Sequence, residues 1–322
     1  MAPSTELAAF LKAQRARLRP EDVGLVSDTV PRRVPGLRRE EVARLAGVST
    51  DYYTRLEQGR KASPSDSVIN AVARALLMDK AGRQHLYDLC RPVLERPTHA
   101  PSVQRVRRPA QLLLDSLADQ PALVVGRGTE VLAINALGRA LLADFEAMPA
   151  IQRNYTRWML LDPQARILFR DWPVRAAEMV ASLRMEAGRH PDDQGISNLV
   201  GELMVNSREF SAWWADQRVI VHNHGIKSLH HPLVGDLDLH WQNLIMAGDD
   251  QQNLVVYFAE PESSAAESLK LLASWSASTA GAERPLMATE SATPQEQRRP
   301  DRGTPGARVR KQAQRLRPPP HA

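Results

Sequence analysis

Apolar positions recur at helical spacing on either side of residue 47, which predicts two short helices joined by a tight turn. From Arg39 to Ala46 the apolar residues share one face, where they can pack. Gly47 follows, and glycine readily adopts the positive φ that a turn between crossed helices requires. Ser49 then stands at the N-cap position of a second helix, and Gly59 stands where that helix should end. The pattern is typical of a helix-turn-helix.

Similar apolar stripes before and after this segment predict three more helices, over residues 6–18, 63–77 and 79–90. The first of them carries basic residues on the side opposite its apolar face. Together the five helices predict an all-α domain over residues 5–91.

A second domain follows a proline-rich stretch. Four prolines between residues 92 and 109 indicate a linker. Residues 110–275 then mix strand-like and helical patterns, which predicts an α+β domain. The predicted strands are 122–125, 130–134, 218–221, 226–231, 235–246 and 253–259, and the predicted helices are 110–117, 135–142, 155–161, 174–187, 195–206, 208–216 and 263–275. Pro, Arg, Gln and Thr dominate the rest, so we expect a disordered basic tail over 276–322.

The composition is that of a globular protein, since 43% of its 322 residues are apolar. The formal net charge is +5, and basic residues crowd the N-terminal hundred positions and the C-terminal end, as phosphate binding by counterion release requires. The single cysteine, Cys90, excludes an internal disulfide and a Cys-based zinc site within one chain. No membrane span or secretory signal is apparent, so we expect a cytoplasmic, nucleoid-associated protein without a membrane partner.

The helix-turn-helix segment resembles the Xre/Cro family of DNA-binding domains. The residues that carry the resemblance are Leu37, Glu40, Glu41, Val42, Ala43, Ala46, Gly47, Val48, Ser49, Tyr53, Leu56, Glu57 and Gly59. The resemblance implies a lambda-repressor-like fold. Where the family usually has Ser/Thr-Gln, this chain has Arg38 and Arg39, which favours phosphate contacts over a Gln-mediated base contact.

Exposed residues that open the second helix can enter a major groove and read base edges. We expect Thr50, Asp51, Tyr52 and Arg55 to do so, although the place of Asp51 at the helix start explains it equally well. Basic side chains beside them suit phosphates, whereas Tyr53 belongs to the core. The full set of predicted DNA-binding residues is Arg38, Arg39, Ser49, Thr50, Asp51, Tyr52, Arg55, Arg60 and Lys61.

The second region resembles the ligand-binding domain of MmyB-like transcription regulators, a family with a PAS-like fold. The resemblance spans roughly residues 107–274 and rests on motifs such as Val131-Leu132-Ala133-x-Asn135, Arg153-Asn154, Leu161-Asp162-Pro163, Asp171-Trp172, Gly188-Arg189-His190-Pro191-Asp192-Asp193 and His231-Pro232-x-x-Gly235. Ile134 stands where the family usually has Trp. The resemblance implies a small apolar effector, such as a long-chain fatty acid. We expect no cofactor.

Aromatic residues beyond residue 150 could line a pocket for such a molecule, although most of them belong to a core. A carboxylate head group would need a cation, for which Arg153 and Arg184 are candidates. Alternatively, both arginines tie helices to buried carbonyls or acids. The predicted ligand-binding residues are Asn135, Arg153, Tyr155, Trp158, Trp172, Arg184, Trp213, Trp241 and Tyr257.

Histidines form the main alternative chemistry. His222 and His224 could share one face of a strand and bind a metal with their neighbours, because residues i and i+2 point the same way. The neighbours in question are His230, His231, Asp238 and His240. No cysteine joins them, and the His-Pro motif explains His231, so surface histidines are the preferred interpretation. We predict no catalytic and no metal-binding residue, and no Gly-x-Ser-x-Gly nucleophile elbow is present.

Taken together, these patterns predict a sequence-specific transcriptional regulator, a repressor and not an enzyme. It would bind a palindromic, double-stranded operator as a homodimer and sense a small apolar effector through its C-terminal domain. Two alternatives stay open. The second domain could serve dimerisation alone, or it could be a metal-dependent enzyme fused to a DNA-binding module.

Overall fold

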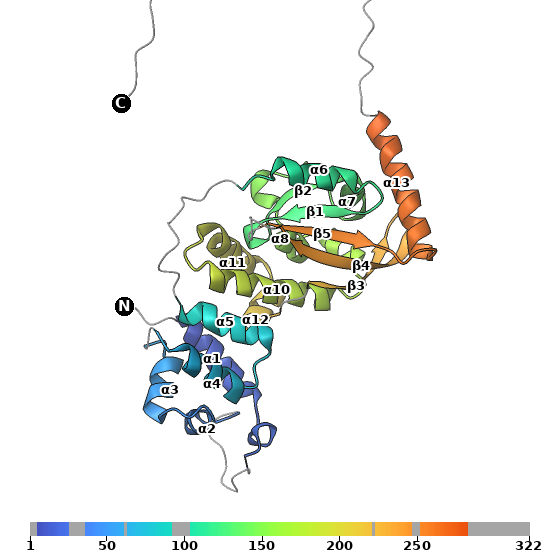
Figure 1. Ribbon diagram of the computed structural model, residues 1–322. Helices are drawn as coiled ribbons and strands as arrows, with labels where there is room; N and C mark the ends of the chain where they lie inside the picture. The colour runs from blue at the N-terminus through green and yellow to red at the C-terminus, as the bar shows by residue number, and fades with distance from the viewer. Residues whose placement is uncertain are drawn as a thin grey trace, which may run out of the picture. The chain divides into compact units, whose positions relative to one another are not determined.

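The N-terminal part of the molecule consists of short helices, as its apolar spacing predicts. The computed structural model describes residues 5–25, 36–60, 63–91, 104–220, 223–246 and 252–282. Its first helices are α1 (Thr5–Arg17), α2 (Arg39–Leu45), α3 (Thr50–Glu57), α4 (Asp66–Ala75) and α5 (Lys80–Cys90), with a 3-10 turn, η1 (Pro20–Val23), after α1 (Figure 1). All five predicted helices are therefore present, and α2 and α3 form the helix-turn-helix.

The turn between α2 and α3 uses the residues that predicted it. Gly47 has a φ of +66°, in the left-handed region that favours glycine. The hydroxyl of Ser49 caps α3 by accepting a hydrogen bond from the amide of Tyr52 at 3.1 Å. Gly59, also at a φ of +66°, follows the last turn of α3. These three residues therefore determine where α3 begins and ends.

A buried carboxylate, Glu57, fixes α3 to the two helices before it. Nε of Arg15 on α1 lies 2.8 Å from one of its oxygens, and Nε of Arg39 on α2 lies 2.9 Å from the other. Burial raises the pKa of Glu57, but the hydrogen bonds and charges of the two arginines outweigh burial and hold this pKa below its ordinary value. The carboxylate is therefore ionised at neutral pH and ties three helices together.

The C-terminal part is an α+β domain around a five-stranded antiparallel sheet with the strand order β2-β1-β5-β4-β3. The strands are β1 (Ala122–Val125), β2 (Val131–Ile134), β3 (His224–His231), β4 (Gly235–Ile245) and β5 (Asn253–Phe258). The helices are α6 (Arg108–Ser116), α7 (Ala136–Leu141), α8 (Tyr155–Leu161), α9 (Pro163–Leu168), α10 (Trp172–Arg189), α11 (Gln194–Asn206), α12 (Arg208–Ala215) and α13 (Ser264–Ala282), with 3-10 turns η2 (Arg127–Thr129) and η3 (Ala150–Gln152).

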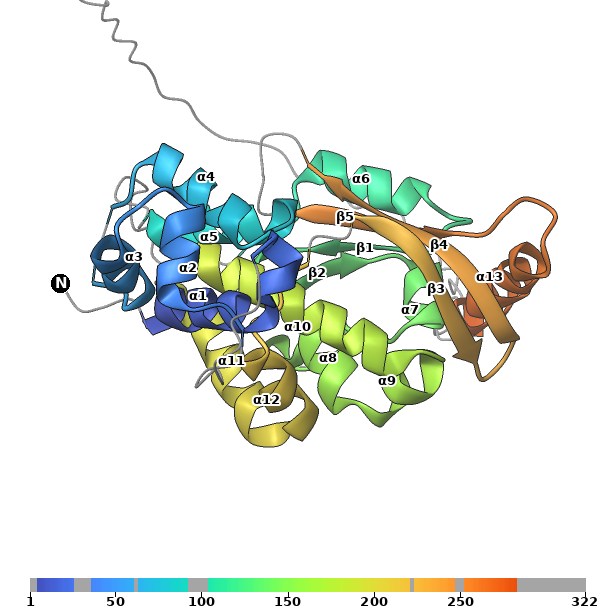
Figure 2. The same ribbon diagram turned by 90° about the horizontal axis from the view of Figure 1, so that it is seen from below.

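Helices cover both faces of this sheet, but unequally. Helix α6 lies on one side, whereas α8, α10 and α11 lie on the other (Figures 1 and 2). The larger core is on the second side, where the buried side chains of Leu123, Leu239 and Tyr257 meet those of the helices. Period-two alternation along each strand therefore separates a deep core from a thinner layer under α6.

Three predictions of chain organisation need comment. The predicted strand over 218–221 is wrong for residues 218–220, because Val219 packs with the helices of the N-terminal core instead of pairing in the sheet. Helix α9 was not predicted, although Asp162 caps it and Pro163 opens it. Helix α13 runs to Ala282, past the predicted start of the tail. The remainder of that tail, and residues 92–103 of the predicted linker, lie outside the described residues.

Among the helices that the structure describes, none is long and apolar enough to cross a membrane.

Candidate DNA-binding and ligand-binding sites

The start of α3 presents most of the side chains that the sequence predicts to read DNA. Thr50, Asp51 and Arg55 are exposed, and Tyr52 is half-buried. Asp51 and Arg55 face each other one turn apart, with Oδ2 and Nη2 separated by 2.9 Å. Tyr53 is fully buried, as its predicted core position requires. The helix therefore turns one polar face outward and one apolar face to its neighbours.

The other predicted DNA contacts border this polar face. Ser49 is exposed and caps α3, so its hydroxyl already holds one backbone amide. Arg38 precedes α2, and the Arg39 side chain is 44% exposed despite its ion pair with a buried carboxylate. Arg60 is exposed just beyond α3, whereas Lys61 lies outside the described residues. Basic groups thus surround the helix that would enter the major groove.

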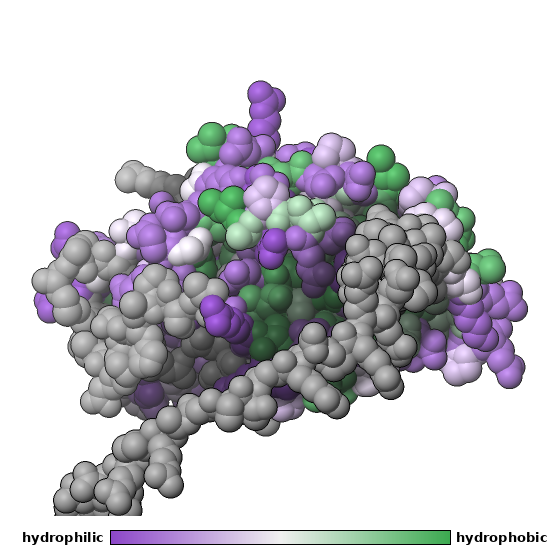
Figure 3. Space-filling model, turned by 90° about the horizontal axis from the view of Figure 1, so that it is seen from above, coloured by the Kyte–Doolittle hydropathy of each residue, from purple (hydrophilic) through white to green (hydrophobic). Residues whose placement is uncertain are grey.

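A cavity of about 770 Å³ lies between the sheet and α10, which is the size of a site for a small molecule. Its depth is apolar and aromatic, with Met159, Met179, Leu123, Val255 and Trp241 among the lining residues. Charged side chains of α5 and α10 line its rim. On the face drawn in Figure 3, hydrophobic residues gather in a central hollow with hydrophilic residues around it. An apolar interior with a few polar groups suits an amphiphilic ligand.

Lys227 of β3 lines this cavity and, unlike the arginines in the lining, is buried. The residue is 6% exposed, and its Nζ donates to the hydroxyls of Tyr257 at 3.0 Å and Tyr155 at 3.4 Å. The same ammonium lies 4.7 Å from the ring centroid of Trp241 and within 6 Å of three further aromatic rings. Burial, with a smaller contribution from Tyr257, raises the pKa of Tyr155 well above its ordinary value, so this hydroxyl stays neutral.

Lys227 differs from the arginines of the cavity lining in lacking an acidic partner. Each of those arginines forms ion pairs: Arg175 with Asp171 and Glu178, Arg189 with Glu186 and Asp88, and Arg91 with Asp66. Within the described part of the chain, no carboxylate lies within ion-pair distance of Lys227. A buried charge is costly unless it is paired, and the partners of Lys227 among the described residues are two tyrosine hydroxyls and aromatic rings.

Comparison with known families accounts for both halves of the chain. The family described as "MmyB-like transcription regulator ligand binding domain" matches residues 106–272, and a family described as "Helix-turn-helix domain" matches residues 6–86. The chain belongs to the MmyB-like transcription regulators. It is a DNA-binding transcription regulator with a ligand-binding domain, and both predicted resemblances are confirmed. A search of curated proteins found no match.

Of the nine predicted ligand-binding residues of this MmyB-like regulator, three line the cavity. They are Tyr155, Trp241 and Tyr257, all grouped around Lys227. The indole N–H of Trp241 is buried and has no hydrogen-bond partner among the described residues. These three residues remain our candidates for ligand binding.

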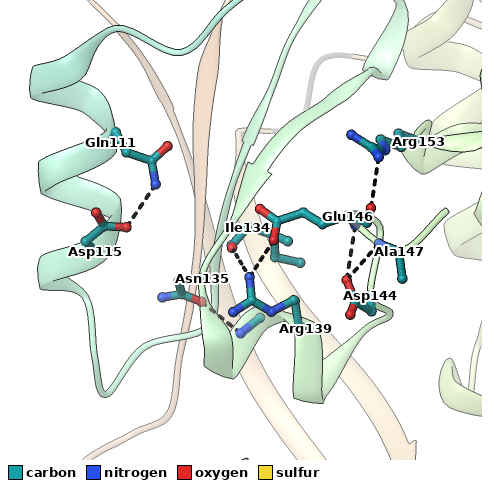
Figure 4. A network of polar contacts seen from close by, with 10 residues as sticks. Gln111, Asp115, Ile134, Asn135, Arg139, Asp144, Glu146, Ala147 and Arg153 are labelled. Carbon is teal, nitrogen blue, oxygen red and sulfur yellow. Dashed lines mark hydrogen bonds and ion pairs between the residues drawn. The ribbon is translucent and has the colours of Figure 1, made fainter. Parts of the chain in front are cut away.

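Asn135 and Arg153 instead belong to polar networks that hold loops in place (Figure 4). The carbonyl oxygen of the Asn135 side chain caps α7 by accepting the amide of Gly138 at 2.8 Å. The guanidinium of Arg153 donates to the backbone carbonyls of Met148 and Glu146, each at 2.9 Å. Arg153 also borders a second cavity, of about 630 Å³, whose lining does not include Lys227. The Arg153 guanidinium is thus bonded to backbone carbonyls of the loop before it.

Arg184 and three tryptophans also have structural positions outside the cavity lining. Arg184 is 1% exposed, donates to Gln217 at 2.9 Å and to the carbonyl of Trp214, and lies 3.5 Å from Glu6. Burial lowers its pKa to about 10, so it is still a cation at neutral pH. The tryptophans that pack into or against the main core are Trp158, Trp172 and Trp213.

The histidines of this regulator form no metal site in the described part of the chain, where no group of three potential ligands comes together. His230 pairs with Asp236 at 2.6 Å, and His240 pairs with Glu260 at 3.0 Å. His231 is buried and bonded to the carbonyl of Ala140. His222 lies outside the described residues.

Lys227 was missed by the sequence analysis, yet a signal for it exists. Lys227 lies on the same face of β3 as Leu229 and His231, and both of these residues are buried. A lysine on the inward side of an alternating strand is unusual, because lysine is rarely buried without a partner. The same alternation that predicted the strand therefore marks the position.

Proposed function

We propose that this regulator is a repressor whose C-terminal, PAS-like domain binds an amphiphilic carboxylic acid of the fatty-acid type. The carboxylate would pair with Lys227, and the hydrocarbon chain would lie along the apolar floor formed by β4 and β5. The buried ammonium of Lys227, which has no acidic partner among the described residues and lies in the lining of a largely apolar cavity, is the observation that carries this proposal. On this ground we propose that the cavity serves binding and not catalysis.

Calorimetric titration of the full chain tests this assignment. Myristate should bind, whereas methyl myristate, which has the same chain but no charge, should bind about tenfold more weakly or worse, as expected for the loss of a charged hydrogen bond. Lys227→Met should remove this preference for the acid. Lys270→Met provides a matched control, because Lys270 is an exposed lysine on α13. Equal binding of acid and ester by the wild-type protein would refute the proposed class of effector.

We also propose that the regulator acts as a homodimer on a palindromic site. Three exposed apolar side chains lie on strands β3, β4 and β5: Ile226 and Phe258 flank His240 in the strand register, and Leu244 lies four residues further along β4. Exposed apolar groups gathered on a sheet are typical of an association surface. Sedimentation analysis should find a dimer for the wild type and a monomer for Phe258→Glu. A wild-type monomer that still binds its operator would contradict the proposal.

A further inference from the structure

Helix α5 of the DNA-binding region contributes to the rim of the ligand cavity. Gln84, Tyr87 and Asp88 of α5, together with Arg91 just after it, line the same cavity as Lys227. The matched ligand-binding domain begins only at residue 106, so these four residues lie outside it. The cavity is therefore built from both functional parts of the chain.

The rim depends on close packing of α5 against the end of α10. His85 of α5 is fully buried, and a Cβ added to Gly188 would lie 2.5 Å from its ring. Met185 of α10 packs in the core of the N-terminal helices. Asp88 and Arg189 form an ion pair across the same contact between α5 and the end of α10, which we call the α5–α10 joint, with Oδ2 and Nε 3.5 Å apart. Burial, with the nearby charges of two arginines, lowers the pKa of His85 to about 3, so the ring is neutral in this joint.

Helix α5 and Lys227 lie at opposite ends of the cavity. The β4 side chains that line the cavity run from Trp241, two residues beyond the partner of Lys227, to Ile245, a span of four residues or about 13 Å. The segment that leads into α10 is bonded to β3 near Lys227, because the amide of Arg170 donates to the carbonyl of Ser228 at 3.0 Å. The other end of α10 packs on α5. An effector anchored at Lys227 must therefore be long to reach α5.

Helix α5 also contacts the helices that position the reading helix. The ring of His85 packs edge-on against Phe10 of α1, with the centroids 4.8 Å apart. The hydroxyl of Tyr87 accepts a hydrogen bond from Asn70 of α4 at 2.7 Å. Helix α1 is in turn joined to α3 by the buried ion pair of Arg15 and Glu57. A displacement of α5 would therefore shift α1 and, through this ion pair, the position of α3.

We propose that the effector site is shared by the two domains, and that a long-chain acid held at Lys227 contacts α5 directly and stabilises its packing on α10. This inference rests on the proposed function. It adds a length requirement: a short acid fills the Lys227 end without contacting α5, whereas a long acid bridges both. Differential contact with the packed state is what allows the effector to bias the position of the DNA-reading helix.

Hydrogen exchange on the full chain measures both ends of the site at once. Saturating myristate should slow amide exchange about tenfold in β3 and β4 and also in α5. Octanoate at saturation should slow exchange in the strands but leave α5 unchanged. Protection of the strands by myristate without protection of α5 would overturn the inference while leaving the proposed function intact. No protection of the strands by either acid would overturn both.

A methyl group added at Gly188 should separate α5 from α10. Gly188→Ala places a Cβ against the ring of His85 and should abolish the protection of α5 by myristate, while the strands stay protected. Gly201→Ala is the matched control, since Gly201 also lies within a helix and its added Cβ would meet nothing within 4 Å. Protection of α5 in Gly188→Ala equal to that in Gly201→Ala would contradict the shared site.

A second variant weakens the joint without a steric wedge. Asp88→Asn removes the ion pair with Arg189 and should reduce the myristate protection of α5 several-fold. Asp115→Asn is its control. Asp88 accepts a hydrogen bond from Gln84, and Asp115 accepts one from Gln111, each four residues apart and at 2.9 Å. Asp115 lies on α6, away from α5 and α10 (Figure 4). An unchanged response in Asp88→Asn would count against the shared site.

Discussion

Arg15 and Lys227 are both buried cationic side chains, but their partners differ. Arg15 reaches a buried carboxylate at 2.8 Å and a backbone carbonyl at 2.6 Å, so its charge is compensated within the chain. Lys227 reaches two neutral tyrosine hydroxyls and aromatic rings. The pairing of Arg15 is structural, whereas we propose that the charge of Lys227 serves an effector. The contrast can be tested from both sides.

The largest effect should follow from breaking the compensated site. Glu57→Ala removes the partner of two arginines and leaves Arg15 buried without a counter-charge. We expect the free energy of unfolding of the N-terminal helices to fall by about 3 kcal/mol. Urea denaturation of the full chain, followed through circular dichroism, measures the loss. A change below about 0.5 kcal/mol, as for a surface substitution, would contradict the structural role of this pair.

The same carboxylate gives a pH dependence of known sign. Because the folded-state pKa of Glu57 is lowered from the ordinary value of 4.5, its contribution to stability is present above that value and is lost as the pH falls through the lower, folded-state pKa. The stability difference between wild type and Glu57→Gln should therefore shrink under acid conditions. A difference that persists at low pH would mean that the charge is not the cause.

Removing the uncompensated charge should have the opposite sign. Lys227→Met replaces a buried ammonium with an apolar side chain of similar length, so we expect the ligand-free protein to gain about 1 kcal/mol of stability. Thermal unfolding in the absence of any acid checks this, with Lys270→Met as the exposed control. A loss of stability in Lys227→Met would show that the lysine is structural, like Arg15.

The DNA-reading face gives a smaller effect. Tyr52→Ala should alter the preference among DNA sequences, at a cost of about 1 kcal/mol for the preferred site, because base contacts carry specificity. Selection of bound sequences from a random pool compares the variant with the wild type. An unchanged preference would mean that α3 presents a different face to the bases.

A phosphate contact should act on all sequences alike. Arg39→Ala should weaken DNA binding uniformly and reduce the slope of log affinity against log salt by about one contact. Arg208, exposed on α12, supplies the control variant Arg208→Ala. If the two variants have the same salt slope, Arg39 serves only its ion pair with Glu57.

Local signals explain how much of this molecule the sequence predicts. Gly47, Ser49 and Gly59 specify the helix-turn-helix through φ and capping alone, and these do not depend on distant residues. The error at residues 218–220 has a tertiary cause, since the destination of Val219 is the core of another domain. The role of Arg153 likewise depended on carbonyls that only the folded loop brings near.

The ligand cavity shows the same division. Tyr155, Trp241 and Tyr257 were predicted as ligand-binding residues from their chemistry and the family motifs, but nothing local places them around one lysine. The strand register brings Trp241 and Tyr257 together beside β3, and the packing of α8 on the sheet adds Tyr155. The contribution of α5 could not be predicted, because its apolar spacing explains its packing within the N-terminal domain and says nothing about a second partner.

The most direct test of the central claim is the ionisation of the bound carboxyl group. In the nuclear magnetic resonance spectrum of [1-13C]myristate bound to the full chain, the carboxyl carbon reports its own pKa. Pairing with Lys227 lowers this pKa, so the group should remain a carboxylate down to about pH 5, whereas in Lys227→Met the apolar surroundings should raise its pKa above about 6. A bound acid that titrates above pH 6 in the wild type, or identically in both proteins, would contradict the account.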